Sequence, residues 1–238
     1  PKRVNMNWAN ALEDGSFGLH EFIGLCRLIG AEPYLSINVG SGTPQEALDW
    51  VEYCNFAKGT TLSDERIANG ATEPFKVRYW GIGNEAWGCG GRMTPEYYAN
   101  IYRQYANYMR SFGGTNPFLI ACGPNQNDAA WTRGFFNGMG GGRGPTGYAM
   151  HYYQNGSLPP TAFTVDAMNQ QLSTYQTVER AIVYQRTLID SYNPPAAAGR
   201  RGDLESAESS QALGGSQAQD AQIAASGAGE PARDGPVD

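Results

Sequence analysis

Short apolar runs typical of buried β-strands alternate with longer amphipathic stretches up to about residue 193. The strand-like runs are rich in aliphatic and aromatic residues and cover residues 33–40, 75–85, 117–124 and 147–153. The amphipathic stretches carry apolar residues three or four positions apart and predict helices over residues 17–29, 44–56, 94–109, 131–139 and 175–189. Strand and helix therefore alternate about four times.

One helix start is marked clearly in the sequence. Thr43 precedes Pro44, and Glu46 follows Thr43 by three residues, which is the arrangement of a capping box with proline in the first turn. Strands and helices that alternate every 30 to 45 residues or so are typical of a parallel α/β fold. Both a (β/α)8 barrel and an open sheet fit the pattern. A barrel would be incomplete here, because a closed one needs eight strands and typically about 250 residues.

The composition changes abruptly after Pro195. Every Phe, Trp and Tyr precedes this point, and the residues after it are mostly Ala, Gly, Ser and Gln. Such a segment cannot bury enough apolar surface to offset its conformational entropy. We therefore predict a folded domain over residues 1–195 and a disordered acidic tail over residues 196–238.

Charge and hydropathy narrow the range of partners. The net charge is −6 and no cluster of Lys and Arg is present, which argues against nucleic acid. No apolar run approaches the roughly 18 residues of a membrane helix, and the N-terminus lacks the apolar centre of a signal peptide. These features favour a soluble, cytoplasmic protein without a membrane partner, although the sequence begins at Pro1 and not at Met.

The cysteines and histidines do not form a metal-binding pattern. No two cysteines have C-x-x-C spacing, and two histidines are too few to complete a zinc site. We expect no metal, a structural role for the histidine in the first helix, and buried thiols, because free cysteines are usually buried. The residues concerned are Cys26, Cys54, Cys89, Cys122, His20 and His151.

Glu85 is the leading candidate for a catalytic residue. It follows a predicted strand and two glycines, and parallel α/β folds build active sites after the carboxyl ends of strands. Asn84 and Trp87 flank it, and His151 and Tyr153 end a later strand. Aromatic rings and amides suit sugars, whose C–H faces stack on rings while their hydroxyls need hydrogen-bonding partners. The alternative is an ordinary solvated loop glutamate.

The same segment has a second interpretation, as a dinucleotide-binding loop. Residues 81–86 fit the G-x-G-x-x-A pattern after a strand. However, the glycines of residues 88–91 interrupt the helix that should follow, and Glu85 would place negative charge beside the phosphates. We therefore expect no nucleotide cofactor. Asn38, at the end of the preceding strand, is expected on the same rim as Glu85, as a sugar-binding or a turn-forming residue.

Several blocks of the chain resemble the catalytic domain of glycoside hydrolase family 51, the α-L-arabinofuranosidases. They follow one order, extend over nearly all of residues 1–193, and comprise residues 17–22, 29–34, 38–43, 49–55, 79–85, 87–91 and 151–153. The resemblance implies a (β/α)8 barrel, of which about strands 3 to 6 are present here. It also implies an enzyme that removes terminal α-L-arabinofuranosyl groups from arabinan and arabinoxylan with retention, uses no metal or organic cofactor, and forms homo-oligomers at full length.

The resemblance also assigns roles by position. Glu85 is similar to the general acid/base, and an acid of this kind needs a raised pKa, which we expect burial against Trp and Tyr rings to supply. Tyr153, with His151 nearby, resembles the aromatic wall that orients the nucleophile. The implied substrate-binding residues are Asn38, Asn84, Trp87, His151 and Tyr153.

The sequence departs from the family pattern in two places. Ala86 stands where the family usually has Asn, which we expect to loosen the loop. A retaining enzyme also needs a second carboxylate roughly 5 to 5.5 Å from the first. The family's Asp-Glu-Trp block, which supplies that carboxylate, has no counterpart after Pro194.

These departures predict a fragment whose residues 196–238 are not native to the family. An incomplete barrel would leave a sheet edge unpaired and apolar surface uncovered, which reduces solubility. The expected function is a retaining α-L-arabinofuranosidase by family that is inactive as this chain alone. The alternative is a non-catalytic carbohydrate-binding remnant.

Overall fold

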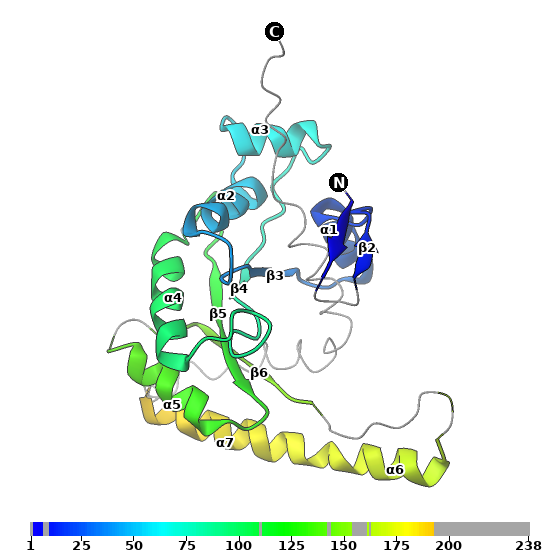
Figure 1. Ribbon diagram of the computed structural model, residues 1–238. Coiled ribbons are helices and arrows are strands. Elements are labelled where there is room, and N and C mark those ends of the chain that lie inside the picture. Colours follow the sequence, from blue (N-terminus) through cyan, green and yellow to red (C-terminus); the bar gives the residue numbers. More distant parts are fainter. Residues whose placement is uncertain are drawn as a thin grey trace.

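The computed structural model describes residues 2–6, 10–109, 111–141, 144–153, 161 and 163–192, so the predicted tail lies outside the described residues. Its main element is a parallel sheet with the strand order β3-β4-β5-β6, in which neighbours in sequence pair with one another (Figure 1). The strands are β3 (Tyr34–Ile37), β4 (Tyr79–Ile82), β5 (Phe118–Asn125) and β6 (Gly147–His151). The predicted parallel α/β fold is therefore confirmed.

Helices connect the strands, and the five predicted helices are all present. They are α1 (Leu19–Ile29), α2 (Pro44–Asn55), α4 (Pro95–Tyr108), α5 (Ala129–Gly138) and α7 (Gln176–Tyr192). The sequence did not predict α3 (Thr61–Ala68), α6 (Val165–Thr174) or the antiparallel hairpin of β1 (Arg3–Asn5) and β2 (Ala11–Glu13). These elements are short or, like α6, bury none of their side chains, so their apolar pattern is weak.

The predicted capping box begins α2. The Glu46 backbone N–H donates to the Thr43 hydroxyl at 3.2 Å, and the Thr43 backbone N–H donates to the Glu46 carboxylate at 2.6 Å. These two bonds satisfy donors that a helix start leaves without an intrahelical partner. Local sequence therefore fixes where the connection from β3 turns into helix.

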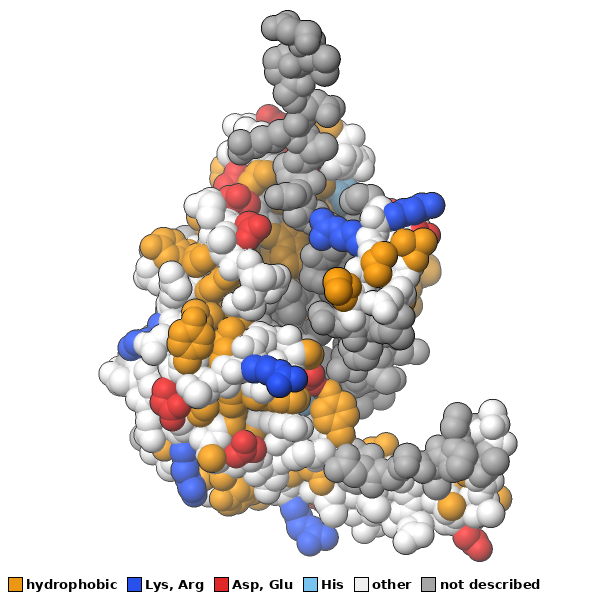
Figure 2. Space-filling view, in the orientation of Figure 1, with side chains coloured by type: hydrophobic (Ala, Val, Ile, Leu, Met, Phe, Trp, Pro, Cys, Tyr) orange, Lys and Arg blue, Asp and Glu red, His pale blue; other side chains and the backbone are white. Residues whose placement is uncertain are grey.

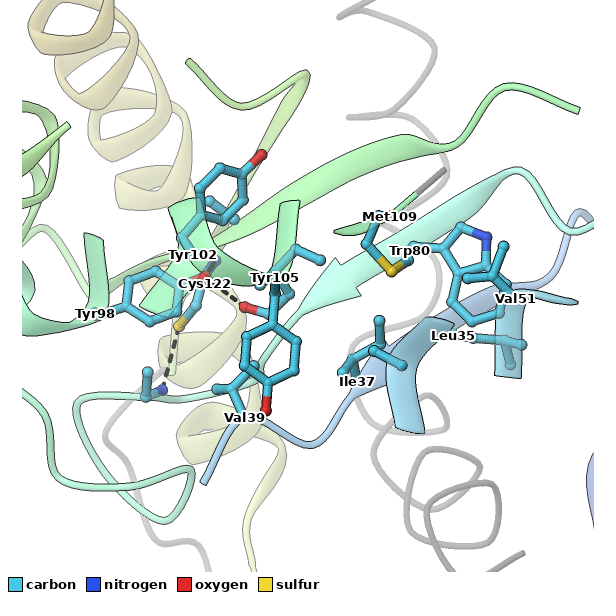
Figure 3. Close-up of a cluster of buried hydrophobic side chains, with 14 of the residues drawn as sticks. Leu35, Ile37, Val39, Val51, Trp80, Tyr98, Tyr102, Tyr105, Met109 and Cys122 are labelled. Carbon is cyan, nitrogen blue, oxygen red and sulfur yellow. Dashed lines mark hydrogen bonds between the residues drawn. The ribbon is translucent and has the colours of Figure 1, made fainter. Parts of the chain in front are cut away.

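The main hydrophobic core lies between the sheet and its covering helices. Trp80 is completely buried and meets Trp50 of α2 edge to face, with ring centroids 5.6 Å apart. Helices α4 and α5 cover the same core through Tyr98 and Phe135, whose centroids are 5.5 Å apart. Figure 3 shows Leu35, Ile37 and Val51 around Trp80 in this core.

The opposite face of the sheet carries a second, smaller cluster. Phe118, Ile120 and Ala149 form it, with Tyr34 and Tyr79 packed against them. Gly81 is required on this face, because a Cβ there would lie 2.5 Å from the Tyr34 hydroxyl oxygen. Burial raises the pKa of Tyr34 to about 12, so its hydroxyl stays protonated at neutral pH.

Apolar side chains also reach the surface. The β1–β2 hairpin exposes Val4, Met6 and Leu12 (Figure 2). In the part of the chain that the structure describes, β3 and β6 each pair along one side only. Within the same part, none of the helices combines the length and apolarity needed to cross a bilayer.

Candidate active site

Glu85 occupies a tight turn directly after β4. Its φ of 46° is in the left-handed region, which is uncommon for a residue other than glycine. The backbone N–H groups of Gly88 and Gly90 both donate to the Glu85 carbonyl oxygen, at 2.7 and 3.0 Å. The chain therefore folds back over Glu85 and holds its backbone at the carboxyl end of the sheet, where the sequence predicted a site.

Tyr98 of α4 anchors the base of this turn. Its hydroxyl donates to the Ile82 carbonyl oxygen at 2.5 Å and accepts from the Cys122 backbone N–H at 2.7 Å, so it bridges the end of β4 and the middle of β5. The Cys122 sulfur in turn accepts from the Ala86 N–H at 3.3 Å (Figure 3). Ala86 is fully buried and its backbone is bonded. That alanine in place of asparagine loosens the loop stays a prediction.

Three side chains donate to or contact the Glu85 carboxyl group. The Tyr153 hydroxyl donates to Oε1, and His151 Nδ1 lies 3.0 Å from the same oxygen. The Cys89 thiol donates to Oε2 at 3.3 Å. Glu85 is only 8% exposed, so these contacts replace most of its hydration. The structure thus brings together Glu85, His151 and Tyr153, which the sequence placed at the ends of two different strands.

The environment of Glu85 favours its ionised form. Burial raises its pKa, but the hydrogen bonds from Tyr153, Cys89 and His151 together outweigh burial and lower the pKa below its usual value. The prediction of a raised pKa is therefore wrong for this structure. It counted the burial of the carboxyl group and missed the three groups that bond to it.

Gln126 fixes the segment that carries His151 and Tyr153. Its backbone N–H donates to the His151 carbonyl oxygen at 2.7 Å, and its side-chain amide donates to the Tyr153 carbonyl oxygen at 2.6 Å. Gln126 itself has a φ of 56°, directly after the register shift between β5 and β6. The sequence did not mark Gln126 as a site residue, because its position after a strand end is the only signal it carries.

Trp87 closes one side of the cluster. Its indole N–H donates to the Gly123 carbonyl oxygen at 3.1 Å, which ties the turn to β5. Its ring meets the His151 ring edge to face, with centroids 6.0 Å apart. Trp87 therefore packs against His151, which contacts the Glu85 carboxyl group, and it belongs to the predicted set.

Asn38 lies on the same rim but bonds within its own loop. Its Oδ1 accepts from the backbone N–H groups of Gly40 and Ser41 at 3.0 and 3.1 Å, and its amide donates to the Ser41 hydroxyl at 2.8 Å. A Cβ on Gly40 would lie 3.2 Å from the Gly90 carbonyl oxygen, so this loop touches the Glu85 turn. Asn84, half-buried, precedes Glu85 on that turn.

The cysteines and the remaining histidine are placed as predicted, except that one cysteine is exposed. Cys26, Cys54 and Cys122 are buried as predicted, but Cys89 is exposed because the Glu85 turn carries it to the rim. His20 bonds the Tyr53 hydroxyl at 2.7 Å and packs on an aromatic ring, which is a structural arrangement. Within the described ranges, no three His, Cys, Asp or Glu side chains gather as metal ligands.

Known proteins with similar sequences are arabinofuranosidases. An intracellular exo-α-L-arabinofuranosidase of Bacteroides ovatus is 41% identical over 198 residues, which are 81% of this chain and 38% of that protein. A probable α-L-arabinofuranosidase C of Aspergillus niger is 41% identical over 133 residues, 55% of this chain and 26% of that protein. The chain thus spans about two fifths or less of the length of these relatives.

Solved structures agree with the sequence relatives. The GH51 arabinofuranosidase of Xanthomonas axonopodis pv. citri matches with a TM-score of 0.74 and 36% identity, over 82% of this chain and 40% of that one. An arabinose complex of α-L-arabinofuranosidase from Thermotoga maritima matches with a TM-score of 0.67 and 34% identity, over 80% of this chain and 37% of that one. These neighbours are TIM-barrel enzymes, so the four strands are part of a (β/α)8 barrel.

The family model of the α-L-arabinofuranosidase 1 domain matches residues 1–180. This match extends over the sheet, the Glu85 turn and the His151–Tyr153 segment. The chain therefore belongs to the α-L-arabinofuranosidases of glycoside hydrolase family 51.

Proposed function

We propose that this chain carries the acid/base half of a retaining α-L-arabinofuranosidase site, with Glu85 as the general acid/base. The observation that carries the proposal is the convergence of His151, Tyr153 and Cys89 on one buried carboxyl group at the carboxyl end of the sheet. Support comes from the family and from the names of the relatives. The activity is a proposal because the chain spans only part of their length.

In this role Glu85 acts twice. As an acid it protonates the oxygen of the departing group, and as a base it removes a proton from the water that releases arabinose. The hydrogen bonds that favour its carboxylate suit the second step directly. In the first step Glu85 must hold a proton, so its pKa has to rise when substrate binds. A bound arabinofuranoside would raise it by displacing water or a hydrogen-bond donor from the carboxylate.

Retention also requires a nucleophilic carboxylate. Of the side chains that hydrogen-bond Glu85 in the described part of the chain, none is a carboxylate. We place the nucleophile outside the described residues.

The division into a domain over residues 1–195 and a tail over residues 196–238 remains part of this proposal.

The substrate would contact the rim around Glu85. We assign Asn38, Asn84 and Trp87 to sugar binding, together with His151 and Tyr153, on arabinofuranosyl oligo- or polysaccharides such as arabinan or arabinoxylan. The hydrogen bonds of Asn38 within its own loop make it the weakest member of this set. The Bacteroides ovatus relative is named intracellular, which supports a cytoplasmic location. Homo-oligomers at full length remain part of the proposal.

Hydrolysis of 4-nitrophenyl α-L-arabinofuranoside tests the role of Glu85. Replacing Glu85→Gln keeps the shape of the side chain and removes its acid/base chemistry, so we expect turnover to fall by about 10²-fold or more. Glu73→Gln makes the same chemical change at an exposed position before β4 and should leave turnover unchanged. Measurable turnover that is equal in the Glu85→Gln variant and the unaltered chain would refute the assignment.

One observation favours a second candidate, carbohydrate binding without catalysis. The donors around Glu85 hold it in its ionised form, which is the wrong state for a general acid in the absence of substrate. Binding of arabino-oligosaccharide measured by calorimetry, without release of arabinose, would support this candidate over the enzyme.

A further inference from the structure

The two oxygens of the Glu85 carboxyl group have unequal partners. Oε1 accepts from the Tyr153 hydroxyl and lies 3.0 Å from His151 Nδ1, and both groups form strong hydrogen bonds. The bond that Oε2 receives within the described residues comes from the Cys89 thiol, at 3.3 Å. A thiol is a weak donor and also a weak acceptor. The carboxyl group is therefore held firmly through one oxygen and loosely through the other.

The turn after β4 dictates the position of this thiol. The Gly88 and Gly90 N–H groups, on either side of Cys89, both donate to the Glu85 carbonyl oxygen. A Cβ at Gly90 would collide with the Asn84 carbonyl oxygen, so this close approach requires glycine. The backbone thus brings Cys89 close to the Glu85 side chain, and its thiol then bonds Oε2.

Cys89 remains a neutral thiol at neutral pH. Cys89 is an exposed residue, but neighbouring atoms shield its sulfur partly from water, and this desolvation and the bond to Glu85 raise the pKa of the thiol above the usual value. The other titratable groups at this point are His151 and Tyr153 from β6 and the loop after it, and the buried Cys122 from β5. The thiol can therefore donate to the carboxylate over the pH range in which Glu85 exchanges its proton.

We propose that Cys89 is a positioning residue that directs the exchangeable proton of Glu85 to Oε2. Protonation of Oε1 would disturb the contacts with Tyr153 and His151. Protonation of Oε2 only requires the thiol to rotate, so that its sulfur accepts the carboxyl proton in place of donating its own. The role in hydrolysis rests on the proposed function of Glu85, whereas the thiol–carboxyl coupling can be measured without turnover.

Alkylation of Cys89 by iodoacetamide tests the coupling from the side of the thiol. Cys89 is the exposed cysteine, and mass spectrometry distinguishes its modification from that of the three buried ones. In the Glu85→Gln variant the thiol loses a negatively charged acceptor, so the midpoint pH of alkylation should fall by about one unit. An unchanged midpoint would overturn the proposal.

Carbon-13 NMR titration of the glutamate carboxyl groups tests the same proposal by measuring the pKa of Glu85. The Glu85 signal is the one that is missing from the spectrum of the Glu85→Gln variant. If Oε2 takes the proton, Cys89→Ala removes the donor from the carboxylate, so the Glu85 pKa should rise by about 0.5 to 1 unit. The remote Cys26→Ala variant should leave it unchanged. If Oε1 took the proton, the thiol would keep donating to Oε2 in both states, so the rise in Cys89→Ala would be smaller. An unchanged Glu85 pKa in Cys89→Ala would overturn the proposal.

The two measurements separate this inference from the proposed function. Coupled titration of Cys89 and Glu85 in a chain that releases no arabinose supports the inference and argues against the enzymatic function. If Cys89 and Glu85 titrate independently in a chain whose turnover depends on Glu85, the proposed function stands and the positioning role of Cys89 is refuted.

Discussion

The turns after β3 and β4 lie on the same rim and differ in how their polar side chains are bonded. Asn38, after β3, is exposed and bonds residues two and three positions further along its own loop. Glu85, after β4, is buried and takes partners from 66 and 68 residues away as well as from its own turn. The bonds of Asn38 therefore only shape its own loop, whereas the bonds of Glu85 fix one carboxyl group between distant segments, as a reactive residue requires.

The two turns are nevertheless anchored from the same helix. Tyr98 of α4 bonds the end of β4, and Tyr105, two turns further along α4, donates to the Gly42 carbonyl oxygen at 2.6 Å in the Asn38 loop. Tyr98 is fully buried and makes two bonds, whereas the Tyr105 bond is partly buried. The Glu85 turn should therefore be the more sensitive of the two to mutation.

The largest expected effect is that of Gly90→Ala. The new Cβ collides with a backbone carbonyl oxygen in the Glu85 turn, which cannot move without breaking the bonds to Glu85. We expect the free energy of unfolding, measured in urea, to fall by about 2 to 3 kcal/mol. Gly88→Ala is the matched control, because its Cβ would meet only the Glu85 carbonyl oxygen at 3.7 Å. Equal losses in the two variants would contradict this view of the turn.

Tyr98→Phe should have the next largest effect. It leaves the Ile82 carbonyl and the Cys122 N–H without their bridging hydroxyl inside the core. An unsatisfied buried polar group costs about 1 to 3 kcal/mol, so we expect a loss of about 2 kcal/mol in the same unfolding experiment. A variant as stable as the unaltered chain would show that the bridge does not anchor the turn.

Tyr105→Phe removes the corresponding anchor of the Asn38 loop and should have a smaller effect. It removes one partly buried bond, and the Gly42 carbonyl oxygen can then bind water. We expect a loss of about 0.5 to 1 kcal/mol. If thermal melts showed Tyr105→Phe to be more damaging than Tyr98→Phe, the order of the two anchors would be wrong.

The smallest effect is a difference in pH dependence. The folded pKa of Glu85 is lowered from 4.5, so its carboxylate adds stability above pH 4.5, and this contribution is lost as the pH falls through the folded pKa. As the pH falls below about 4.5 and through the folded pKa, Glu85→Gln should therefore lose less stability than the unaltered chain. Asn38→Ala removes no titrating group and should shift stability equally at every pH.

The contrast between bonds to near neighbours and bonds to distant segments also explains which features the sequence could predict. The capping box at Thr43 and the spacing of apolar residues depend on neighbours in the chain, so five of the helices and the parallel sheet were predictable. The position of Glu85 after its strand was predictable for the same reason. Its lowered pKa was not, because it depends on Tyr153 and His151, more than 60 positions away, as well as on Cys89 in the same turn. The role of Gln126 was not predictable either, because it depends on a register shift between two strands.

The central claim is that Glu85 acts as a proton donor, and leaving-group dependence tests it most directly. Turnover of an activated aryl arabinofuranoside and of an arabino-oligosaccharide should be compared in the unaltered chain and in Glu85→Gln. We expect the loss to be at least about tenfold greater for the oligosaccharide, whose departing oxygen needs the proton. Equal losses for the two substrates would contradict the claim.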